Sequence, residues 1–393
     1  VRDRMGIKPL YWSMNDNSFI FGSELKSLMT SKKCDFKIDK KSLSLFMKYK
    51  YVPCPLTIFK NVYQLEPATI LTIDKNKNIK KTKYWNLTEV ARSGLEYANI
   101  NKPLLDDEIF DLIECAVKCR LVSDTSIGAF LSGGIDSSAV VALMQKNNPL
   151  PVNTFSMGFS IDSYDESKYA REVAQHLGTN HTEYILEPRD AINLIPNLPK
   201  IYDEPFSDSS QIPTYLLSKL TSKNVKVALS GDGGDEVFGG YNRYLYADKY
   251  SDKFNKMPLW LQKSLQNLIY SFPKNKWNSL FNYLPKKYSH SQGGDKLYKL
   301  ASVIGKDHIE IYQKLISDWQ FTDGLIYSDD EYQDNDYDSN SYFSGKYPVE
   351  YMQLMDQMHY LPDDILRKID RASMANSLEV RVPLLDHRII EKL

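Results

Sequence analysis

The sequence predicts an α/β protein whose larger part is built on a doubly wound parallel sheet. From residue 125 onward, short apolar strands alternate with helices, an order typical of parallel sheets that carry helices on both faces. Two of these strands, residues 125–130 and 225–229, end in glycine-rich turns. Ligands of such sheets bind at the carboxyl ends of the strands, so both turns are candidate binding loops.

Composition narrows the classes of partner. The chain has 393 residues, of which 42% are hydrophobic and 25% charged, and its formal net charge is −1. A near-neutral chain gives no basis for a nucleic-acid partner. No apolar run approaches the roughly 18 residues that span a bilayer, so no membrane partner is expected. Four cysteines do not suggest a disulfide framework and favour a cytoplasmic location. The expected partners are small molecules, and a homodimer is left open.

Residues 1–85 predict a separate, β-rich domain. Short strand-like runs are separated by Asn, Asp, Pro and Lys turns, and one short helix is expected. The strands are expected at residues 10–12, 19–22, 57–62 and 68–73, and the helix at 23–29. A polar linker is predicted at residues 86–103, and residues 104–393 form the second domain, which opens with an amphipathic helix at 104–121.

The first glycine-rich turn has the features of an anion-binding loop. It reads Phe130-Leu131-Ser132-Gly133-Gly134-Ile135-Asp136-Ser137-Ser138 and leads into an apolar helix. Glycines let the backbone approach a ligand, and the serine hydroxyls add donors beside the free N–H groups of the new helix. A Walker loop would need Lys-Ser or Lys-Thr after the glycines, but Asp136 stands there instead. A carboxylate beside polyphosphate requires a cation, so Mg²⁺-pyrophosphate is expected. The alternative is a strand-to-helix turn without a ligand.

The SGGxDS pattern of this loop resembles the pyrophosphate loop of ATP pyrophosphatases, which implies ATP with Mg²⁺ as its ligand. Met157, at the end of the strand expected at residues 152–159, is placed to border the adenine, although it could also be plain core. The predicted ATP-binding residues are Leu131, Ser132, Gly133, Gly134, Asp136, Ser137, Ser138, Met157, Ser230 and Gly231.

The second turn gathers three carboxylates within five residues. It reads Ser230-Gly231-Asp232-Gly233-Gly234-Asp235-Glu236-Val237-Phe238-Gly239-Gly240-Tyr241. Like charges this close are costly unless a cation neutralises them. Asp136 and Asp235 are predicted to bind Mg²⁺, and Asp232 and Glu236 are candidate catalytic residues. The alternative is an acidic surface loop.

A third segment, residues 361–375, predicts a helix that begins with Pro362 and carries acids in its first turn. Asp364, Lys368 and Arg371 recur at helical spacing and form one polar stripe. Asp364 is the third candidate catalytic residue. By itself, such a stripe is more often an exposed face than a site.

These segments resemble the signatures of one family along nearly the whole chain. SGGxDS resembles the pyrophosphate loop of ATP pyrophosphatases. SGDGGDEVFGGY and LPDDILRKIDRASMANSLEVRVPLLDH are similar to signatures of the asparagine synthetase family. The opening RDRMGIKPLY, with FGSELKSL, resembles the end of the glutaminase domain of class II amidotransferases.

The resemblance implies an adenine nucleotide alpha hydrolase-like synthetase domain that converts aspartate to asparagine through an aspartyl adenylate, with ammonia released from glutamine. A relative that acts on a sugar acid, or one that closes a β-lactam ring, would keep the same ATP loops. A catalytically silent paralogue is a third hypothesis. In the family, Asp3 would pair with the α-amino group of glutamine; the alternative is a solvated surface Asp.

Two parts of the family's machinery are expected outside this chain. The glutaminase nucleophile is an N-terminal cysteine, whereas Cys34 and Cys54 are internal and have no α-amino group to act as a base. The family's adenylation lysine lies downstream of the third signature, beyond Leu393, and Lys368 is not assigned that role. The sequence therefore looks like a fragment.

Overall fold

The computed structural model describes residues 1–15, 18–31, 33, 36–100, 106–160, 165–245, 257–282, 293–319 and 347–393. Cys34 and residues 101–103 of the predicted linker lie outside them. The described chain forms two compact units. The main unit contains the described residues of 1–240 together with 354–393, and the helical unit contains those between 241 and 353. Each unit is described by itself.

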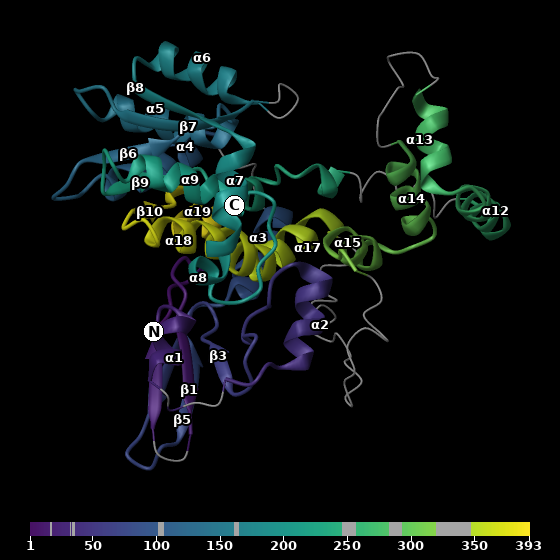
Figure 1. Ribbon diagram of the computed structural model, residues 1–393, viewed down its shortest axis with the longest axis horizontal. Coiled ribbons are helices and arrows are strands. Elements are labelled where there is room, and N and C mark those ends of the chain that lie inside the picture. The colour runs from purple at the N-terminus through teal and green to yellow at the C-terminus, as the bar shows by residue number, and fades with distance from the viewer. Residues whose placement is uncertain are drawn as a thin grey trace. The chain divides into compact units, whose positions relative to one another are not determined.

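A five-stranded, fully parallel sheet forms the centre of the main unit (Figure 1). Its strand order is β10-β9-β6-β7-β8. The strands are β6 (Ile127–Phe130), β7 (Asn153–Phe159), β8 (Asn180–Leu186), β9 (Val227–Leu229) and β10 (Glu379–Arg381). Strands β7 and β8 extend the sheet on one side of β6, and β9 and β10 extend it on the other. The predicted doubly wound sheet is confirmed.

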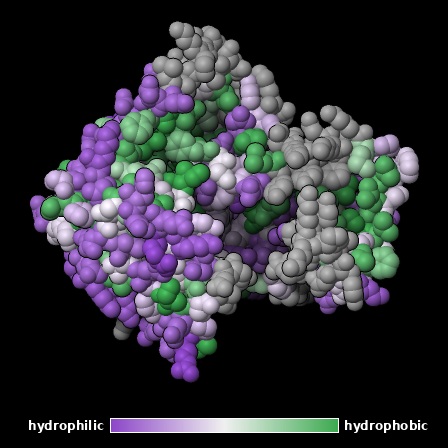
Figure 2. Space-filling model, turned by 90° about the horizontal axis from the view of Figure 1, so that it is seen from above, coloured by the Kyte–Doolittle hydropathy of each residue, from purple (hydrophilic) through white to green (hydrophobic). Residues whose placement is uncertain are grey.

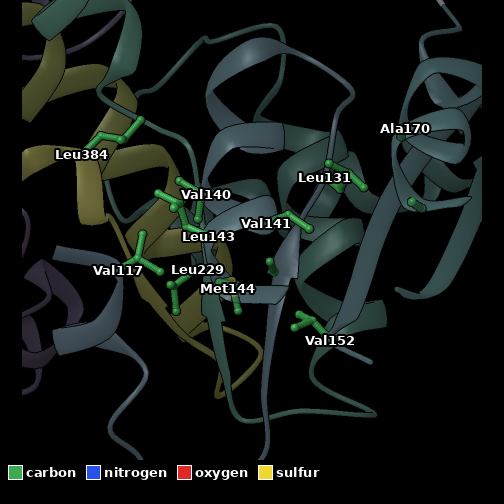
Figure 3. Packing of buried hydrophobic residues seen from close by; sticks show 12 residues of the cluster. Val117, Leu131, Val140, Val141, Leu143, Met144, Val152, Ala170, Leu229 and Leu384 are labelled. Carbon is green, nitrogen blue, oxygen red and sulfur yellow. The ribbon is translucent and has the colours of Figure 1, made fainter. Parts of the chain in front are cut away.

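Helices cover both faces of this sheet. On one face pack α4 (Asp106–Arg120), α5 (Ile135–Lys146) and α6 (Ser167–Leu177), and on the other pack α9 (Gln211–Thr221) and α18 (Leu366–Met374). Successive strand residues point to opposite faces, so Ala129 joins the first core and Phe130 the second. Figure 3 shows the first core, in which Val140, Val141 and Met144 of α5 pack with Leu131 and Leu229.

Further helices of the parallel-sheet part are short. They are α7 (Pro188–Leu194), α8 (Leu198–Tyr202), α10 (Gly234–Phe238) and α19 (His387–Lys392), with 3₁₀ turns at Ile195–Asn197 and Pro383–Leu385. Helix α8 packs against α18, and α19 packs against α4.

The N-terminal part of the main unit contains two small antiparallel sheets. One has the order β2-β1-β3, and the other pairs β4 with β5. Their strands are β1 (Tyr11–Met14), β2 (Phe19–Gly22), β3 (Val62–Gln64), β4 (Thr69–Ile73) and β5 (Ile79–Lys83), accompanied by helices α1 (Leu25–Thr30) and α2 (Lys40–Tyr49). Tyr11, Leu25, Leu28 and Val62 form the core of this part. The β-rich prediction missed α2.

The predicted linker is helical. Residues Leu87–Ile100 form α3, which packs against α19. Leu87 is buried, and Trp85, just before the helix, donates its indole N–H to Glu391. The polar composition of this segment reflects a helix with one covered face, not an unstructured connection.

The prediction that a helix begins at Pro362 is wrong. Helix α17 (Pro348–Met355) continues without interruption into a π-helical segment, Asp356–Ile365, and then into α18. Pro362 lies inside the π-helical segment. Proline lacks an N–H and normally breaks an α-helix, but a local change to a different helical hydrogen-bond pattern accommodates it.

The helical unit contains α12 (Leu259–Tyr270), α13 (Lys274–Asn282), α14 (Gly293–Val303), α15 (His308–Ile316) and most of α17. Trp277 donates to the carbonyl of Ile269, and Tyr312 meets Tyr351 edge to face. Hydrophobic side chains gather on the side of this unit at the right of Figure 2, and α12 exposes Leu259 and Trp260. In the part of the chain that is described, no helix is long and apolar enough to cross a membrane.

A buried ionic cluster joins the N-terminal part to the parallel-sheet part of the main unit. Arg367 of α18 lies 2.7 Å from Glu204 and 3.3 Å from Asp363, and both partner side chains are fully buried. Its guanidinium also donates to the Val52 carbonyl and to the Gln64 side chain.

The carboxylates of this cluster bind the N-terminal part as well. Glu204 accepts the Ile58 N–H at 2.9 Å, and Asp363 accepts the Cys54 N–H at 2.8 Å. Every charge in the cluster therefore has a partner across the junction between the two parts.

We expect Arg367→Ala to destabilise the main unit by about 3–5 kcal/mol, because it leaves two carboxylates buried without their cation. Arg171→Ala is the matched control, since Arg171 pairs with Glu183 but is 61% exposed. Arg171→Ala should lower the free energy of unfolding by about 1 kcal/mol or less. Urea unfolding monitored by circular dichroism measures both. Equal losses in the two variants would show that the buried cluster contributes no more than a surface pair.

Candidate active site

The two glycine-rich turns lie side by side where the strand order of the sheet reverses. Strand β6 pairs in parallel with β9, with Ala129 opposite Leu229, so their carboxyl ends are neighbours. The chain builds the sheet outward from β6 on one side and then returns to place β9 on the other. This reversal leaves a crevice beyond the strand ends, which is where open α/β sheets bind ligands.

The first turn, residues 131–134, is held by its own serines. Ser137 accepts the Ser132 N–H at 3.2 Å, and its hydroxyl bonds that of Ser132 at 3.0 Å. Gly133 has φ +81°, and a Cβ there would lie 2.6 Å from the backbone nitrogen of Ala170 in α6. The backbone can therefore turn here only without a side chain.

This turn presents unpartnered donors at the start of α5. Gly134 is the N-cap of α5 and supplies no side-chain cap for the first N–H groups of the helix. The Ser138 hydroxyl oxygen is buried and has no hydrogen-bond partner among the described residues. A helix N-terminus with a free hydroxyl beside it fits an anionic phosphate group.

The second turn, residues 230–234, is tied to the sheet and to itself. The Ser230 N–H donates to the Arg381 carbonyl of β10 at 2.9 Å, and the Ser230 hydroxyl donates to the Asp232 carboxylate. Gly233 has φ +89° and lies against Leu385. Helix α10 then starts at Gly234 and carries Asp235 and Glu236 in its first turn.

Glycines of the second turn allow it to touch the first. A Cβ on Gly231 would lie 2.7 Å from the backbone nitrogen of Ser137, and a Cβ on Gly234 would overlap the Asp136 carboxyl group. Asp136 therefore lies directly over Gly234. Burial, and then the charges of Asp235 and Asp232, raise the pKa of Asp136. Like charges have been brought together, an arrangement that a cation would stabilise.

The residues present fit a magnesium ion held jointly with a ligand. Among the described residues, no group of three or more His, Cys, Asp or Glu side chains is arranged to hold a metal ion by itself. Mg²⁺ commonly takes one or two protein carboxylates and completes its shell with phosphate oxygens and water. Asp136 and Asp235 could supply that contribution.

Three other predicted site residues lie on α10, on β7 and in the N-terminal part. Glu236 is buried, and its carbonyl accepts from the Gln357 side chain at 3.0 Å. Met157 is partly buried on β7, opposite Tyr184 of β8. Asp3 belongs to the N-terminal part, where its carboxylate accepts the N–H groups of Ile7 and Lys8.

The sequence matches two known families along most of its length. Residues 108–393 match the asparagine synthase family, and residues 1–85 match the glutamine amidotransferase domain. The chain belongs to the asparagine synthase family. The three signatures predict the asparagine synthetase family, and this prediction is confirmed.

Relatives in this family are longer than the chain. Asparagine synthetase [glutamine-hydrolyzing] 1 of Bacillus subtilis (strain 168) is 32% identical over 402 residues, which cover 100% of this chain and 58% of that protein. Putative asparagine synthetase [glutamine-hydrolyzing] 2 of Methanocaldococcus jannaschii is 42% identical over 266 residues, covering 66% of this chain and 50% of that protein. The chain thus spans 50–58% of the length of these two relatives.

Asp364 lies in a second polar cluster of the synthase domain. Lys368 Nζ is 3.3 Å from Asp208 Oδ2, and the Ser210 N–H donates to Asp208 Oδ1 at 2.6 Å. Burial first, and then the adjacent Asp208, raise the pKa of Asp364 to about 7. Burial alone would raise the pKa of Asp208, but Lys368 and Ser210 hold it below its usual value.

Sequence reasoning missed Asp208, Ser210 and Glu204. The available signal was the run Glu204-Pro205-Phe206-Ser207-Asp208-Ser209-Ser210 directly before a helix, which concentrates residues that bond nearby backbone groups. The alternative that Asp364, Lys368 and Arg371 form an exposed face does not hold, since all three are buried.

Gly231→Ala should lower the free energy of unfolding by about 1–3 kcal/mol, because the added methyl group meets the backbone of α5. Gly94→Ala is the control: Gly94 lies in α3, and nothing stands within 4 Å of the position that the added methyl group would take. The free energy of unfolding of Gly94→Ala should rise by about 0.5–1 kcal/mol. Urea denaturation compares the two. A Gly231→Ala variant as stable as the wild type would contradict the close contact between the turns.

Stability should fall as the pH rises through the titration of Asp364. The folded state binds the proton of the Asp364 carboxyl group more tightly than the unfolded state does. The stability that this proton contributes is therefore lost between about pH 4 and pH 7. Asp364→Asn removes the titration. Its stability relative to the wild type should rise by roughly 2–4 kcal/mol between pH 5 and pH 8. A difference that stays constant across this range, in urea titrations at each pH, would contradict the raised pKa.

Proposed function

We propose that the protein makes asparagine from aspartate, ATP and glutamine-derived ammonia, releasing AMP and pyrophosphate. One observation carries the proposal: the two glycine-rich turns touch at the reversal of the strand order, with Asp136 over Gly234. We further propose that residues 1–85 belong to the glutaminase domain, residues 86–103 connect the domains, and residues 104–393 belong to the synthetase domain.

In the first step, a side-chain oxygen of aspartate attacks the α-phosphorus of ATP. The bond between the α-phosphorus and the bridging oxygen breaks, so pyrophosphate leaves and aspartyl adenylate forms. We propose that the N–H groups at the start of α5 and the hydroxyls of Ser132 and Ser138 bind the departing pyrophosphate. Asp136 and Asp235 would hold Mg²⁺, which when bound neutralises charge on the phosphates.

In the second step, ammonia attacks the carbonyl carbon of the adenylate. The bond from that carbon to the AMP oxygen breaks, and the nitrogen loses one proton. Asp232 lies on the second turn with its carboxylate held by the Ser230 hydroxyl, so we propose it as the acceptor of that proton. Glu236 would position the turn, and Asp3 would bind the α-amino group of glutamine in the glutaminase domain.

Asp136→Asn and Asp235→Asn should each abolish ATP cleavage while leaving the circular dichroism spectrum unchanged, because each removes one of the charges proposed to hold the cation. Asp111→Asn, on the exposed surface of α4, is the control and should turn over normally. Pyrophosphate release measures all three. Full turnover in either of the first two variants would remove that residue from the site.

The acceptor is tested with the protein as its gene encodes it. Pyrophosphate release is measured with a panel of carboxylic acids, first with ammonia and then with glutamine. Release that depends on aspartate supports the proposal. Release only with another acid, such as a sugar acid, would assign a different acceptor, and no release with any acid would indicate a protein that binds without catalysis.

A further inference from the structure

One lysine of the N-terminal part forms hydrogen bonds at both of its ends. In the loop of residues 3–8 (the glutamine loop), the Lys8 backbone N–H donates to the Asp3 carboxylate at 3.0 Å. The Lys8 ammonium lies 2.9 Å from a carboxylate oxygen of Asp370, which belongs to α18. Asp3 is the residue proposed to bind the α-amino group of glutamine, and α18 packs on the parallel sheet. Lys8 therefore connects the proposed glutamine-binding carboxylate to the synthetase domain.

A buried arginine holds the glutamine loop together. Arg2 is 2% exposed, and its guanidinium donates to the carbonyls of Gly6 at 3.0 Å and Lys8 at 3.1 Å. The Asp3 carboxylate also accepts the Ile7 N–H at 2.8 Å. Because these bonds fix the loop internally, a displacement of Asp3 must shift Lys8 as well.

The other end of this connection lies at the second glycine-rich turn. Asp370 belongs to a helix that continues without a break over residues 356–374. Near the start of this helix, the Gln357 side chain donates to the Glu236 carbonyl of α10 at 3.0 Å. Described contacts therefore lead from the glutamine loop along the helix to the turn that is proposed to bind Mg²⁺.

The ion pair between Lys8 and Asp370 is better suited to positioning than to stability. The Lys8 side chain is 47% exposed, whereas that of Asp370 is 6% exposed. An ion pair with one half-exposed partner adds little to stability, because water screens it. Breaking the pair would nevertheless leave the buried Asp370 carboxylate with Arg371, 3.8 Å away, as its remaining described ion-pair partner. The pair therefore favours one separation between the glutamine loop and α18.

We propose that Lys8 couples the two sites, so that ligands of the glutamine pocket and of the nucleotide turns change each other's affinity through the Lys8–Asp370 pair. Lys8 is a positioning residue, since it acts through Asp3 and α18. This inference rests on the proposed function and adds a link between its two sites. Thermodynamic linkage makes the effect reciprocal: each ligand must change the affinity for the other by the same factor.

Lys26 provides a matched control for Lys8. Its side chain is 44% exposed and lies 3.3 Å from Asp203, whose side chain is 3% exposed. This ion pair also joins the N-terminal part to the parallel-sheet part, but Lys26 lies in α1, outside the glutamine loop. Loss of Lys26 should therefore cost about as much stability as loss of Lys8 and leave the coupling intact.

L-Glutamate and α,β-methylene-ATP with Mg²⁺ probe the two sites without turnover, and saturating aspartate keeps L-glutamate out of the acceptor site. L-Glutamate retains the α-ammonium that Asp3 is proposed to bind. Isothermal titration calorimetry on the protein as its gene encodes it gives the dissociation constant of each probe with and without the other. The ratio of the two constants is the coupling factor. In the wild type, the two constants should differ by about 3- to 5-fold for either probe, as suits a half-exposed ion pair.

Lys8→Met should bring the coupling factor to about 1, because it removes the cation that Asp370 binds. This variant should still bind α,β-methylene-ATP alone with wild-type affinity, which shows that it is folded. Lys8→Arg keeps the cation and should retain most of the wild-type factor. Lys26→Met should keep the wild-type factor in full.

A coupling factor of 1 in the wild type, a wild-type factor in Lys8→Met, or equal losses in Lys8→Met and Lys26→Met would overturn the inference. These failures leave aspartate-dependent pyrophosphate release, which tests the proposed function, intact. A wild-type protein that does not bind L-glutamate would overturn the assignment of residues 1–85 to a glutaminase domain, and this inference with it.

Discussion

The pairing of β6 with β9 is the constraint on which the proposed site depends. Neither turn offers a complete binding site, since the first supplies donors at the start of α5 and the second supplies carboxylates. Parallel pairing of their strands brings the turns into contact, and glycines at positions 231 and 234 leave room for that contact. Burial, and then the charges of Asp235 and Asp232 in the second turn, raise the pKa of Asp136.

Much of this arrangement could be predicted because its signals are local. The strand before each turn, the glycines and the carboxylates all lie within short stretches, and the alternation of strands and helices predicts a parallel sheet. That both turns lie at the ligand-binding edge of the sheet also follows from a general rule, because such sheets bind ligands at the carboxyl ends of their strands. The alternation of side chains along β6 is likewise local: it places Ala129 in one core and Phe130 in the other.

The errors lie where distant parts of the chain decide the outcome. Lys368 and Arg371 are compatible with an exposed stripe because nothing local indicates that Lys368 pairs with Asp208 or that the N-terminal part covers Arg371. Arg371 is buried beside Glu24 and the Ser23 carbonyl, both far away in sequence. Pro362 indicates a helix start by propensity, but the preceding helix continues through it as a π-helical segment. Tertiary packing overrides propensity at both positions.

Adjacent residues of one helical segment serve both parts of the main unit. Asp363 accepts the Cys54 N–H of the N-terminal part, while Asp364 bonds Asp208, which lies just before α9. Successive side chains around a helix diverge by roughly 100°, so neighbouring residues can address opposite sides. Arg367 and Lys368 repeat this division one turn later. Because a single rigid element carries both sets of contacts, a shift of α18 that rearranges one set must disturb the other.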